Sequence, residues 1–259
     1  MTLIVALEGK DGLALAADSR GTFGDPRGVT AQNDSVKKLY RVSNYVGILV
    51  AGAGELAVSL MDDVEKIINS EGLTGATQIY EKFIEIARAK YSNWFKDFTI
   101  QPVQGSEKPA RPGIAAIIAG YNLDDDGKPS EKKVYKLHSL LDFAPQRSNY
   151  GFAVDGIAQY ALYLFNRFYT KDRGVDELMH LATYSITETA TQDGKVGGPV
   201  QAMVITDVSG TRELTKGEID KIIASNERRS TRLRNSFFAP QARNDSTQNK
   251  ATRRKKGAK

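Results

Sequence analysis

The order of apolar segments is the feature of this chain that most constrains its fold. Residues 2–7, 45–51 and 113–121 are short apolar runs, suited to strands that are buried on both faces. Between them, residues 56–68 place apolar side chains three and four positions apart, which is the spacing of an amphipathic helix. Two sheets stacked face to face, each covered by a pair of helices, would bury such strands. We therefore predict an α+β fold, a four-layer αββα sandwich.

The predicted elements follow the order strands, two helices, strands, two helices, strands. A helix over 56–72 is followed by a second helix over 74–97 and by a Pro-containing loop over 99–113. Further along, the sequence predicts a hairpin turn at 124–129, a strand at 134–140, helices from near Gly156 and at 175–191, a strand at 201–207, and a last short helix at 216–226.

The composition argues against several classes of site. The chain has no cysteine, which excludes disulfides and thiolate chemistry. His138 and His180 lie in no cluster with ligand spacing, so we predict no metal site. Three carboxylates at 124–126 lack the further ligands of a Ca²⁺ loop, and we interpret them as solvated turn charges. No apolar run approaches the ~18 residues of a membrane span, and no secretory leader precedes the first strand. We therefore expect a cytoplasmic protein.

The positive charge is concentrated at the carboxyl end of the chain. Residues 226–259 contain eleven Lys or Arg against two acidic residues, a net charge of +9. Because the whole chain carries +5, residues 1–225 carry −4. We predict one globular domain over 1–225 and a basic, disordered tail over 226–259, since such a run has too few apolar residues to build a core.

Thr2 carries chemistry that few other positions offer. Thr is small enough for Met1 to be removed during synthesis, which would leave Thr2 with a free α-amine beside its hydroxyl. A hydroxyl needs a base to become a nucleophile. An α-amine, with an ordinary pKa of about 7.7–8.0, is such a base near neutral pH. Most chains that begin Met-Thr simply lose a methionine, so the assignment depends on the residues that come after Thr2.

An ordered set of features comes after Thr2. They are an acidic residue and an arginine at the end of the second strand, a lysine before a Leu-aromatic pair, and a glycine after the next strand, namely Asp18, Arg20, Lys38 and Gly52. This order resembles the amino-terminal half of a proteasome β-type subunit, an N-terminal nucleophile hydrolase. The resemblance covers about residues 2–225 and implies the same αββα sandwich.

The charged residues of this set have a physical rationale. A hairpin places Asp18 near Thr2, and a buried ammonium beside the Thr2 hydroxyl would lower the pKa of that hydroxyl. Asp18 would compensate the burial of that ammonium, and Arg20 could brace Asp18 from the same strand face. Side chains alternate along a strand, so only one of Lys37 and Lys38 faces inward. The resemblance selects Lys38. The alternative is an ordinary surface group of ion pairs.

The resemblance also implies a substrate site. The backbone amide of Gly52 would be the oxyanion donor. Thr22, Gly52 and Gly54 match positions that, in the family, hold the substrate as an added antiparallel strand. The alternative for the two glycines is a strand-ending bulge. The side chain next to the cut bond would lie in an open, apolar pocket formed by Gly21, Val36, Val50, Gly54 and Val58.

Two positions depart from the family pattern. Asp193 fits the Asp of an Asp-x-x-Ser-Gly-Gly segment that abuts the nucleophile, but Val196 replaces its Ser. Asp155 falls where the family has a Ser that contacts the N-terminal amine. A carboxylate beside the α-ammonium should raise the pKa of the amine.

The resemblance implies a threonine peptidase that acts on peptides or unfolded proteins without a cofactor. It further implies a homo-oligomeric ring and a possible ATP-dependent unfoldase partner. One alternative is a related N-terminal-Thr amidase or peptide ligase, which shares the first chemical step. Another is a non-catalytic ring or scaffold subunit. Nucleic-acid binding would rest on the basic tail alone, and solvated disorder is the commoner meaning of such a run.

Overall fold

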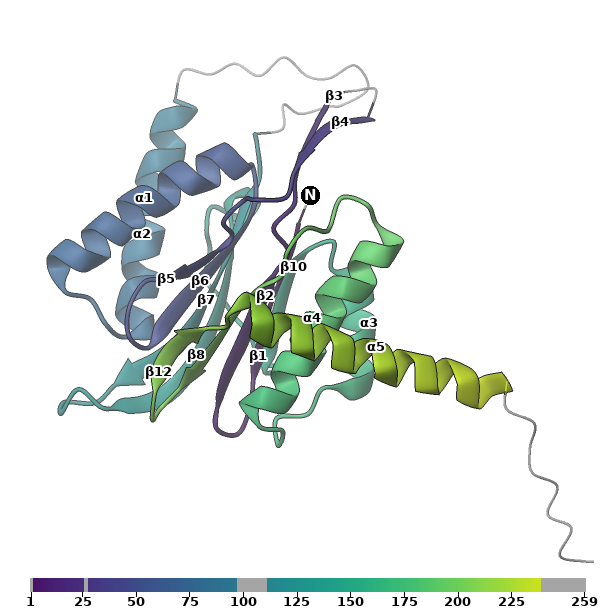
Figure 1. Cartoon of the computed structure of the whole chain (residues 1–259). Coiled ribbons are helices and arrows are strands. Elements are labelled where there is room, and N and C mark those ends of the chain that lie inside the picture. The colour runs from purple at the N-terminus through teal and green to yellow at the C-terminus, as the bar shows by residue number, and fades with distance from the viewer. Residues whose placement is uncertain (1, 26–27, 97–110, 239–259) are drawn as a thin grey trace, which may run out of the picture. The chain divides into compact units, whose positions relative to one another are not determined.

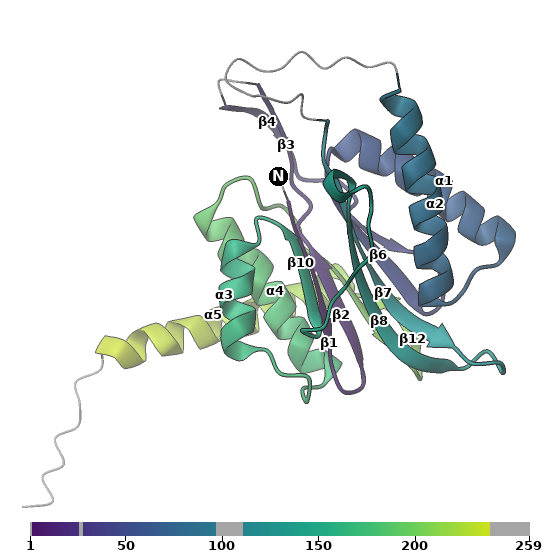
Figure 2. The ribbon, with the colours of Figure 1, turned by 180° about the vertical axis from the view of Figure 1, so that it is seen from behind.

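The computed structural model describes residues 2–25, 28–96 and 111–238. The chain divides into two compact units, Met1–Ile223 and Ala224–Lys259. The first unit holds every strand and most of the helices that the structure describes (Figures 1 and 2).

The first unit is built on two five-stranded antiparallel sheets. In spatial order the first sheet consists of β10 (Phe152–Gly156), β1 (Leu3–Glu8), β2 (Gly12–Ala17), β11 (Gln201–Thr206) and β12 (Gly210–Glu213). The second sheet consists of β5 (Leu39–Arg41), β6 (Val46–Gly52), β7 (Ile114–Leu123), β8 (Pro129–His138) and β9 (Gln146–Arg147). A separate two-stranded ribbon is formed by β3 (Gly21–Asp25) and β4 (Gly28–Asn33).

Each sheet is covered by one pair of long helices. The second sheet packs against α1 (Gly54–Glu71) and α2 (Ala76–Trp94), and the first against α3 (Gln159–Phe168) and α4 (Val175–Gln192). Figures 1 and 2 show the two pairs on opposite outer faces, with both sheets between them. A short 3₁₀ turn spans Ser139–Leu141, and α5 spans Lys216–Phe238. The predicted αββα sandwich is therefore confirmed.

The central strands show why two layers of helices are needed. Along β1, Leu3, Val5 and Leu7 pack against the helices, while Ile4 and Ala6 pack between the sheets. Because side chains alternate across a strand, an apolar residue at every position gives the strand two faces to bury. One face enters the helix layer and the other enters the core between the sheets.

The β10–α3 corner differs from the sequence prediction. Gly156 ends a strand, and α3 begins only at Gln159, so the helix starts later than predicted. Gly156 has φ +91°, and a Cβ at this position would lie 1.8 Å from the carbonyl oxygen of Thr2. Only glycine allows the backbone to approach this closely, so the corner is fixed by its contact with the first strand.

The last helix extends beyond its predicted end. The sequence predicts a helix that ends at Asn226 and disorder beyond it, whereas α5 continues to Phe238. Residues 226–238 contain neither Gly nor Pro, and arginine is a good helix former, so no residue in this range interrupts the helix. The rest of the predicted tail lies outside the described residues, as do Met1, residues 26–27 and most of the predicted loop over 99–113.

Two kinds of feature are absent from the described residues. No helix among them combines the length and the apolar character that a membrane crossing requires. Within the same residues, no three His, Cys, Asp or Glu side chains gather in a group that could hold a metal ion.

Candidate active site

Thr2 lies directly before β1, an interior strand of the first sheet. Thr2 is 6% exposed. Strand β1 begins at the next residue and pairs with β10 on one side and with β2 on the other (Figure 2). The carbonyl oxygen of Thr2 accepts a 2.8 Å hydrogen bond from the backbone N–H of Ile157. The main chain at Thr2 is therefore held on the side that faces β10.

Asp18 is fully buried beside this strand and accepts four hydrogen bonds. Its Oδ1 accepts from the backbone N–H of Leu3 at 2.9 Å and from Nζ of Lys38 at 2.8 Å. Its Oδ2 accepts from the backbone N–H groups of Arg20 at 3.2 Å and Gly197 at 3.1 Å. An ionised carboxylate has about four acceptor sites, so this side chain is fully satisfied as an anion.

Lys38 is the cation of this buried pair. Besides Asp18, its Nζ donates a 2.6 Å hydrogen bond to the carbonyl oxygen of Arg20. Burial lowers the pKa of Lys38, and the negative charge of Asp18 opposes this shift without reversing it. Its neighbour Lys37 points outward, with 57% of its side chain exposed and its Nζ 4.3 Å from the centre of the Tyr40 ring. The two lysines thus take opposite faces of the chain.

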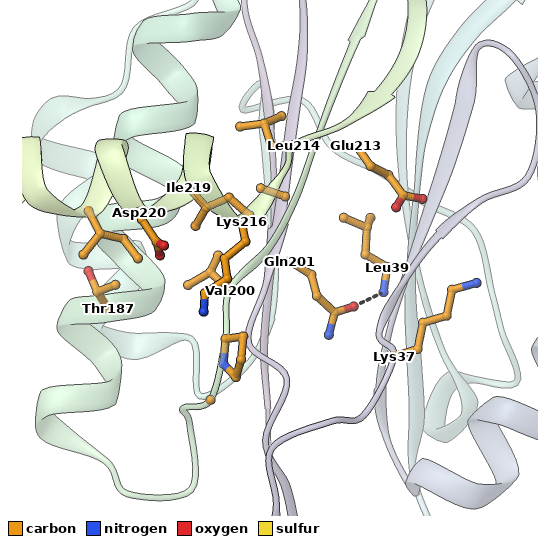
Figure 3. Close-up of a pocket in the computed structure, with 14 residues that line it drawn as sticks. Lys37, Leu39, Thr187, Val200, Gln201, Glu213, Leu214, Lys216, Ile219 and Asp220 are labelled. Carbon is orange, nitrogen blue, oxygen red and sulfur yellow. Dashed lines mark hydrogen bonds between the residues drawn. The ribbon is translucent and has the colours of Figure 1, made fainter.

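Gln201, which was not predicted from the sequence, anchors the backbone that carries Lys38. Its Oε1 accepts from the backbone N–H groups of Lys38 at 2.9 Å and Leu39 at 3.2 Å, and its Nε2 donates to the carbonyl oxygen of Val36 at 2.7 Å. Figure 3 shows its carboxamide pointing toward Leu39. The side chain therefore joins β11 of the first sheet to the segment that enters β5 of the second. A lone glutamine gives no sequence signal for this role.

Gln201 also lines a pocket of about 540 Å³. Its walls come from the start of α5, from β11 and β12, and from α4, with Val200, Leu214 and Ile219 among the apolar side chains (Figure 3). Lys37 and Leu39 line the same pocket, so it lies beside the backbone that carries Lys38.

Arg20 contacts Asp18 through its backbone, not through its side chain. The guanidinium donates two hydrogen bonds to Asp34, at 2.7 and 2.8 Å, and one to the carbonyl oxygen of Gly194 at 3.0 Å. This pair raises the pKa of Arg20 and lowers the pKa of Asp34. Strand β2 ends at Ala17, so the alternation that predicted a side-chain brace on Asp18 does not extend to Arg20. Asp34 was not predicted.

Asp193 follows the last residue of α4 and begins the turn whose Gly197 contacts Asp18. Its Oδ1 accepts a 2.9 Å hydrogen bond from the backbone N–H of Lys195, within its own turn. Val196 is fully buried in the helix-side core, and Gly197 supplies the N–H that reaches Asp18. The contact between this turn and the Asp18 carboxylate is thus made by backbone.

Asp155 points toward the second sheet. Its Oδ2 lies 2.8 Å from Nζ of Lys136 on β8, and its Oδ1 accepts a 2.7 Å hydrogen bond from the backbone N–H of Gly156. From the sequence we expect this carboxylate beside the N-terminal amine, and Lys136 was not predicted.

The predicted substrate residues lie in two groups. In the first, a Cβ at Gly21 would lie 2.7 Å from a Val36 methyl group, and Thr22 is the next residue of β3. The second covers the end of β6 and the start of α1, with Val50 buried, Gly52 at φ +105°, Gly54 exposed and Val58 38% exposed. A Cβ at Gly52 would lie 2.1 Å from the carbonyl oxygen of Gly113, so glycine is required there.

The chain is similar to a known protein family over most of its length. A family model described as "Proteasome subunit" matches residues 2–205. The proteasome subunit beta of Methanopyrus kandleri is 23% identical over 223 residues, which cover 86% of this chain and 95% of that protein. The proteasome subunit beta of Rhodococcus jostii is 26% identical over 76% of this chain, and the match spans 63% of that protein's length.

A comparison of folds adds a solved structure. The Anbu (Gly-1) mutant from Hyphomicrobium sp. strain MC1 superposes with a TM-score of 0.68, covering 93% of this chain and 98% of that one. The sequence identity is 15%, so this similarity concerns the fold alone.

Proposed function

Because the chain belongs to the proteasome subunit family, we propose that it is a threonine peptidase whose nucleophile is the hydroxyl of Thr2. The observation that carries the proposal is the buried pair of Asp18 and Lys38, whose shared oxygen also accepts the N–H of Leu3. That N–H belongs to the peptide bond between Thr2 and Leu3. The pair is therefore tied to the residue next to the proposed nucleophile.

The charges of this pair suit activation of a hydroxyl. The two hydrogen bonds of Lys38 to Asp18 and to the Arg20 carbonyl use two of the three N–H donors of an ammonium. We assign the third donor to Oγ of Thr2. A cation that donates a hydrogen bond to Oγ stabilises the alkoxide that forms as the hydroxyl loses its proton. This lowers the pKa of the hydroxyl.

The reaction needs only groups of the protein and water. Once Met1 is removed, the α-amine of Thr2 takes the proton from Oγ as Oγ attacks a peptide carbonyl carbon. The backbone N–H of Gly52 would donate to the oxyanion of the tetrahedral intermediate. Collapse breaks the peptide C–N bond, and the proton passes to the leaving amine. Water then attacks the ester, releases the new carboxyl group and returns the hydroxyl to Thr2.

We place the substrate as an extended strand between the two groups of predicted substrate residues. The backbone at Gly21 and Thr22 would pair with one side, and the backbone from Gly52 to Gly54 with the other. Val36, Val50 and Val58 supply an apolar wall for the side chain next to the cut bond. A Leu- or Phe-sized side chain buried there gains roughly 1.5–3 kcal/mol.

The assembly and its surroundings belong to the same proposal. Members of this family typically form oligomeric rings, and we propose a homo-oligomeric ring that receives peptides or unfolded chains. An ATP-dependent unfoldase partner and a cytoplasmic location would fit such a ring.

Covalent labelling of Thr2 tests the function. A peptide epoxyketone carries two electrophilic carbons, which can react with the hydroxyl and the α-amine of the same residue. Intact mass spectrometry before and after labelling reports the removal of Met1 and the identity of the nucleophile together. Wild type and Thr2→Ser should be labelled and cleave peptides, whereas Thr2→Ala should do neither while keeping its fold.

Thr191→Ala serves as the matched control, because Thr191 is an exposed residue near the end of α4. It should behave as wild type in both assays. Peptide cleavage by Thr2→Ala at the wild-type rate would refute the proposed function.

A further inference from the structure

An ion pair between the two sheets lies close to the proposed nucleophile. Nζ of Lys136 lies 2.8 Å from Oδ2 of Asp155 and donates a 2.9 Å hydrogen bond to the carbonyl oxygen of Val154. Lys136 belongs to β8 in the second sheet, and Asp155 to β10 in the first. The side chains are 32% and 14% exposed, so this contact is partly screened from water.

The strand register places Asp155 on the same face as Thr2. Asp155 pairs directly with Ile4, whose side chain enters the core between the sheets. Thr2 lies two residues before Ile4, so an extended chain points both side chains to that face. The N–H of Ile157 bonds to Thr2, which makes Asp155 a diagonal neighbour of Thr2. Diagonal neighbours in antiparallel sheets lie roughly 7–8 Å apart.

The same pair fixes the corner that contacts Thr2. Asp155 accepts a hydrogen bond from the N–H of Gly156, and the Gly156 backbone packs against the carbonyl oxygen of Thr2. The position of the Asp155 carboxylate is thus linked to the position of the first residue of the mature chain.

We propose that Lys136 is a positioning residue that holds the Asp155 carboxylate in an ion pair across the sheets, so that this carboxylate does not keep the Thr2 α-amine protonated. The inference rests on the proposed function, in which that amine must accept a proton. Asp155 is then a paired anion near the amine and not a direct partner of it. An unpaired anion at this distance would favour the ammonium form, and an unpaired cation would oppose it.

Other charged groups lie on the neighbouring elements. They are Asp18 and Arg20 after β2, Asp34 and Lys38 before β5, Glu55 at the start of α1, and Asp193 and Lys195 between α4 and β11. Asp18, Arg20, Asp34 and Lys38 are linked by the hydrogen bonds described above. Changes at Lys136 and Asp155 therefore alter the charge near Thr2 without removing a partner from that network.

The test is a charge cycle built from Lys136→Met, Asp155→Asn and the double variant in the full chain. The first readout is the titration of the Thr2 α-amine, followed by NMR on protein carrying ¹⁵N-labelled threonine and checked by mass for removal of Met1. The second is the pH dependence of peptide cleavage. The first readout does not require activity, so a failure of the proposed function and a failure of this inference can be told apart.

The expected shifts have opposite signs. Lys136→Met leaves Asp155 unpaired, so the titration of the amine and the acid limb of the cleavage profile should move up by on the order of one pH unit. Asp155→Asn leaves Lys136 unpaired, so both should move down. The double variant removes both charges and should return close to wild type. A shift of one unit lowers the fraction of free amine below its pKa about tenfold.

Lys133→Met is the matched control. Lys133 lies on the same strand and pairs with Glu131 at 2.5 Å, so its removal breaks an ion pair of β8 without exposing Asp155. It should leave the titration of the amine unchanged. The inference would be overturned if the titration of the amine shifted equally in this control. It would also be overturned if Lys136→Met and Asp155→Asn shifted the titration in the same direction, or if neither shifted it. Retention of Met1 would overturn both the inference and the proposed function.

Discussion

The ammonium of Lys38 lies 2.8 Å from the carboxylate of Asp18, and the two side chains are only 5% and 0% exposed. Neither charge would be stable alone at this depth, because desolvation of an isolated ion costs several kcal/mol. The carboxylate is satisfied by backbone N–H groups that come from β1 and from the turn before β11. The pair therefore depends on β1 and this turn being assembled, and it places a cation near the start of β1.

Replacing Lys38 should be far more damaging than replacing Lys37. Lys38→Met leaves the buried Asp18 without its cation, which is expected to destabilise the fold by about 3–5 kcal/mol and to abolish most peptide cleavage. Lys37→Met removes an exposed side chain and should change the stability by less than about 0.5 kcal/mol. Chemical denaturation and a peptide-cleavage assay measure both effects. Reversed phenotypes would mean that Lys37 is the residue that serves the nucleophile.

The lowered pKa of Lys38 predicts an alkaline limit to activity. The pKa of Lys38 in the folded chain lies below the ordinary value of 10.5, so more than half of the ammonium is deprotonated at pH 10.5, and cleavage should fall with it. Between the pKa of Lys38 in the folded chain and its higher pKa in the unfolded chain, the unfolded chain binds more protons at this site. In that pH range the contribution of Lys38 to the free energy of unfolding therefore rises with pH. The cleavage profile of wild type, with Lys37→Met as control, measures the limit. A constant rate through pH 10.5 would contradict the role of Lys38.

Gly156→Ala should displace the start of the first strand. A Cβ there meets the Thr2 carbonyl oxygen at 1.8 Å, in addition to the strain of φ +91°. Gly127→Ala is the matched control, since Gly127 has φ +75° but nothing within 4 Å of a Cβ. The control should lose about 1–3 kcal/mol through backbone strain, and Gly156→Ala a further ~1–3 kcal/mol through overpacking. Equal losses in thermal or chemical unfolding would show that the close approach is unimportant.

Gln201→Met should lower kcat and leave KM nearly unchanged. The substitution keeps the size of the side chain but leaves two N–H groups and one carbonyl without their partner, each at a cost of about 1–3 kcal/mol if no water replaces it. The backbone that carries Lys38 would then shift, so kcat should fall while KM changes little. Gln192→Met, at an exposed position at the end of α4, is the control. An unchanged kcat would remove Gln201 from the site.

The predicted substrate pocket, formed by Gly21, Val36, Val50, Gly54 and Val58, is apolar and predicts cleavage after large apolar residues. Peptides that differ only in the residue before the cut should be cleaved after Leu, Tyr or Phe at least about tenfold faster than after Lys or Asp, because a buried charge would lack a partner. Val58→Glu would place a carboxylate at a position that is 38% exposed and should raise cleavage after Lys. A wild-type preference for basic residues would refute the pocket while leaving the role of Thr2 open.

The αββα sandwich could be predicted from the sequence alone, because the burial pattern of a strand is visible in its own residues. In β1, successive residues from Leu3 to Leu7 alternate between the helix-side core and the core between the sheets, and every one of them is apolar. That pattern is local, with a period of two residues, and it can be read without knowledge of the partners. Lys38 faces inward and Lys37 outward, as predicted, although both residues lie just before β5, which begins at Leu39.

The partners of side chains far apart in the sequence were decided by the tertiary structure. Arg20 pairs with Asp34 instead of Asp18 because the chain leaves the strand at Ala17 and the alternation ends there. Gln201 reaches Lys38 from a distant part of the chain, and Lys136 reaches Asp155 from the other sheet. These contacts depend on how the two sheets close on each other. No local period of the sequence records that closure. The sequence therefore determined the layers and the inward lysine, whereas the packing of the sheets determined which charged side chains pair with each other.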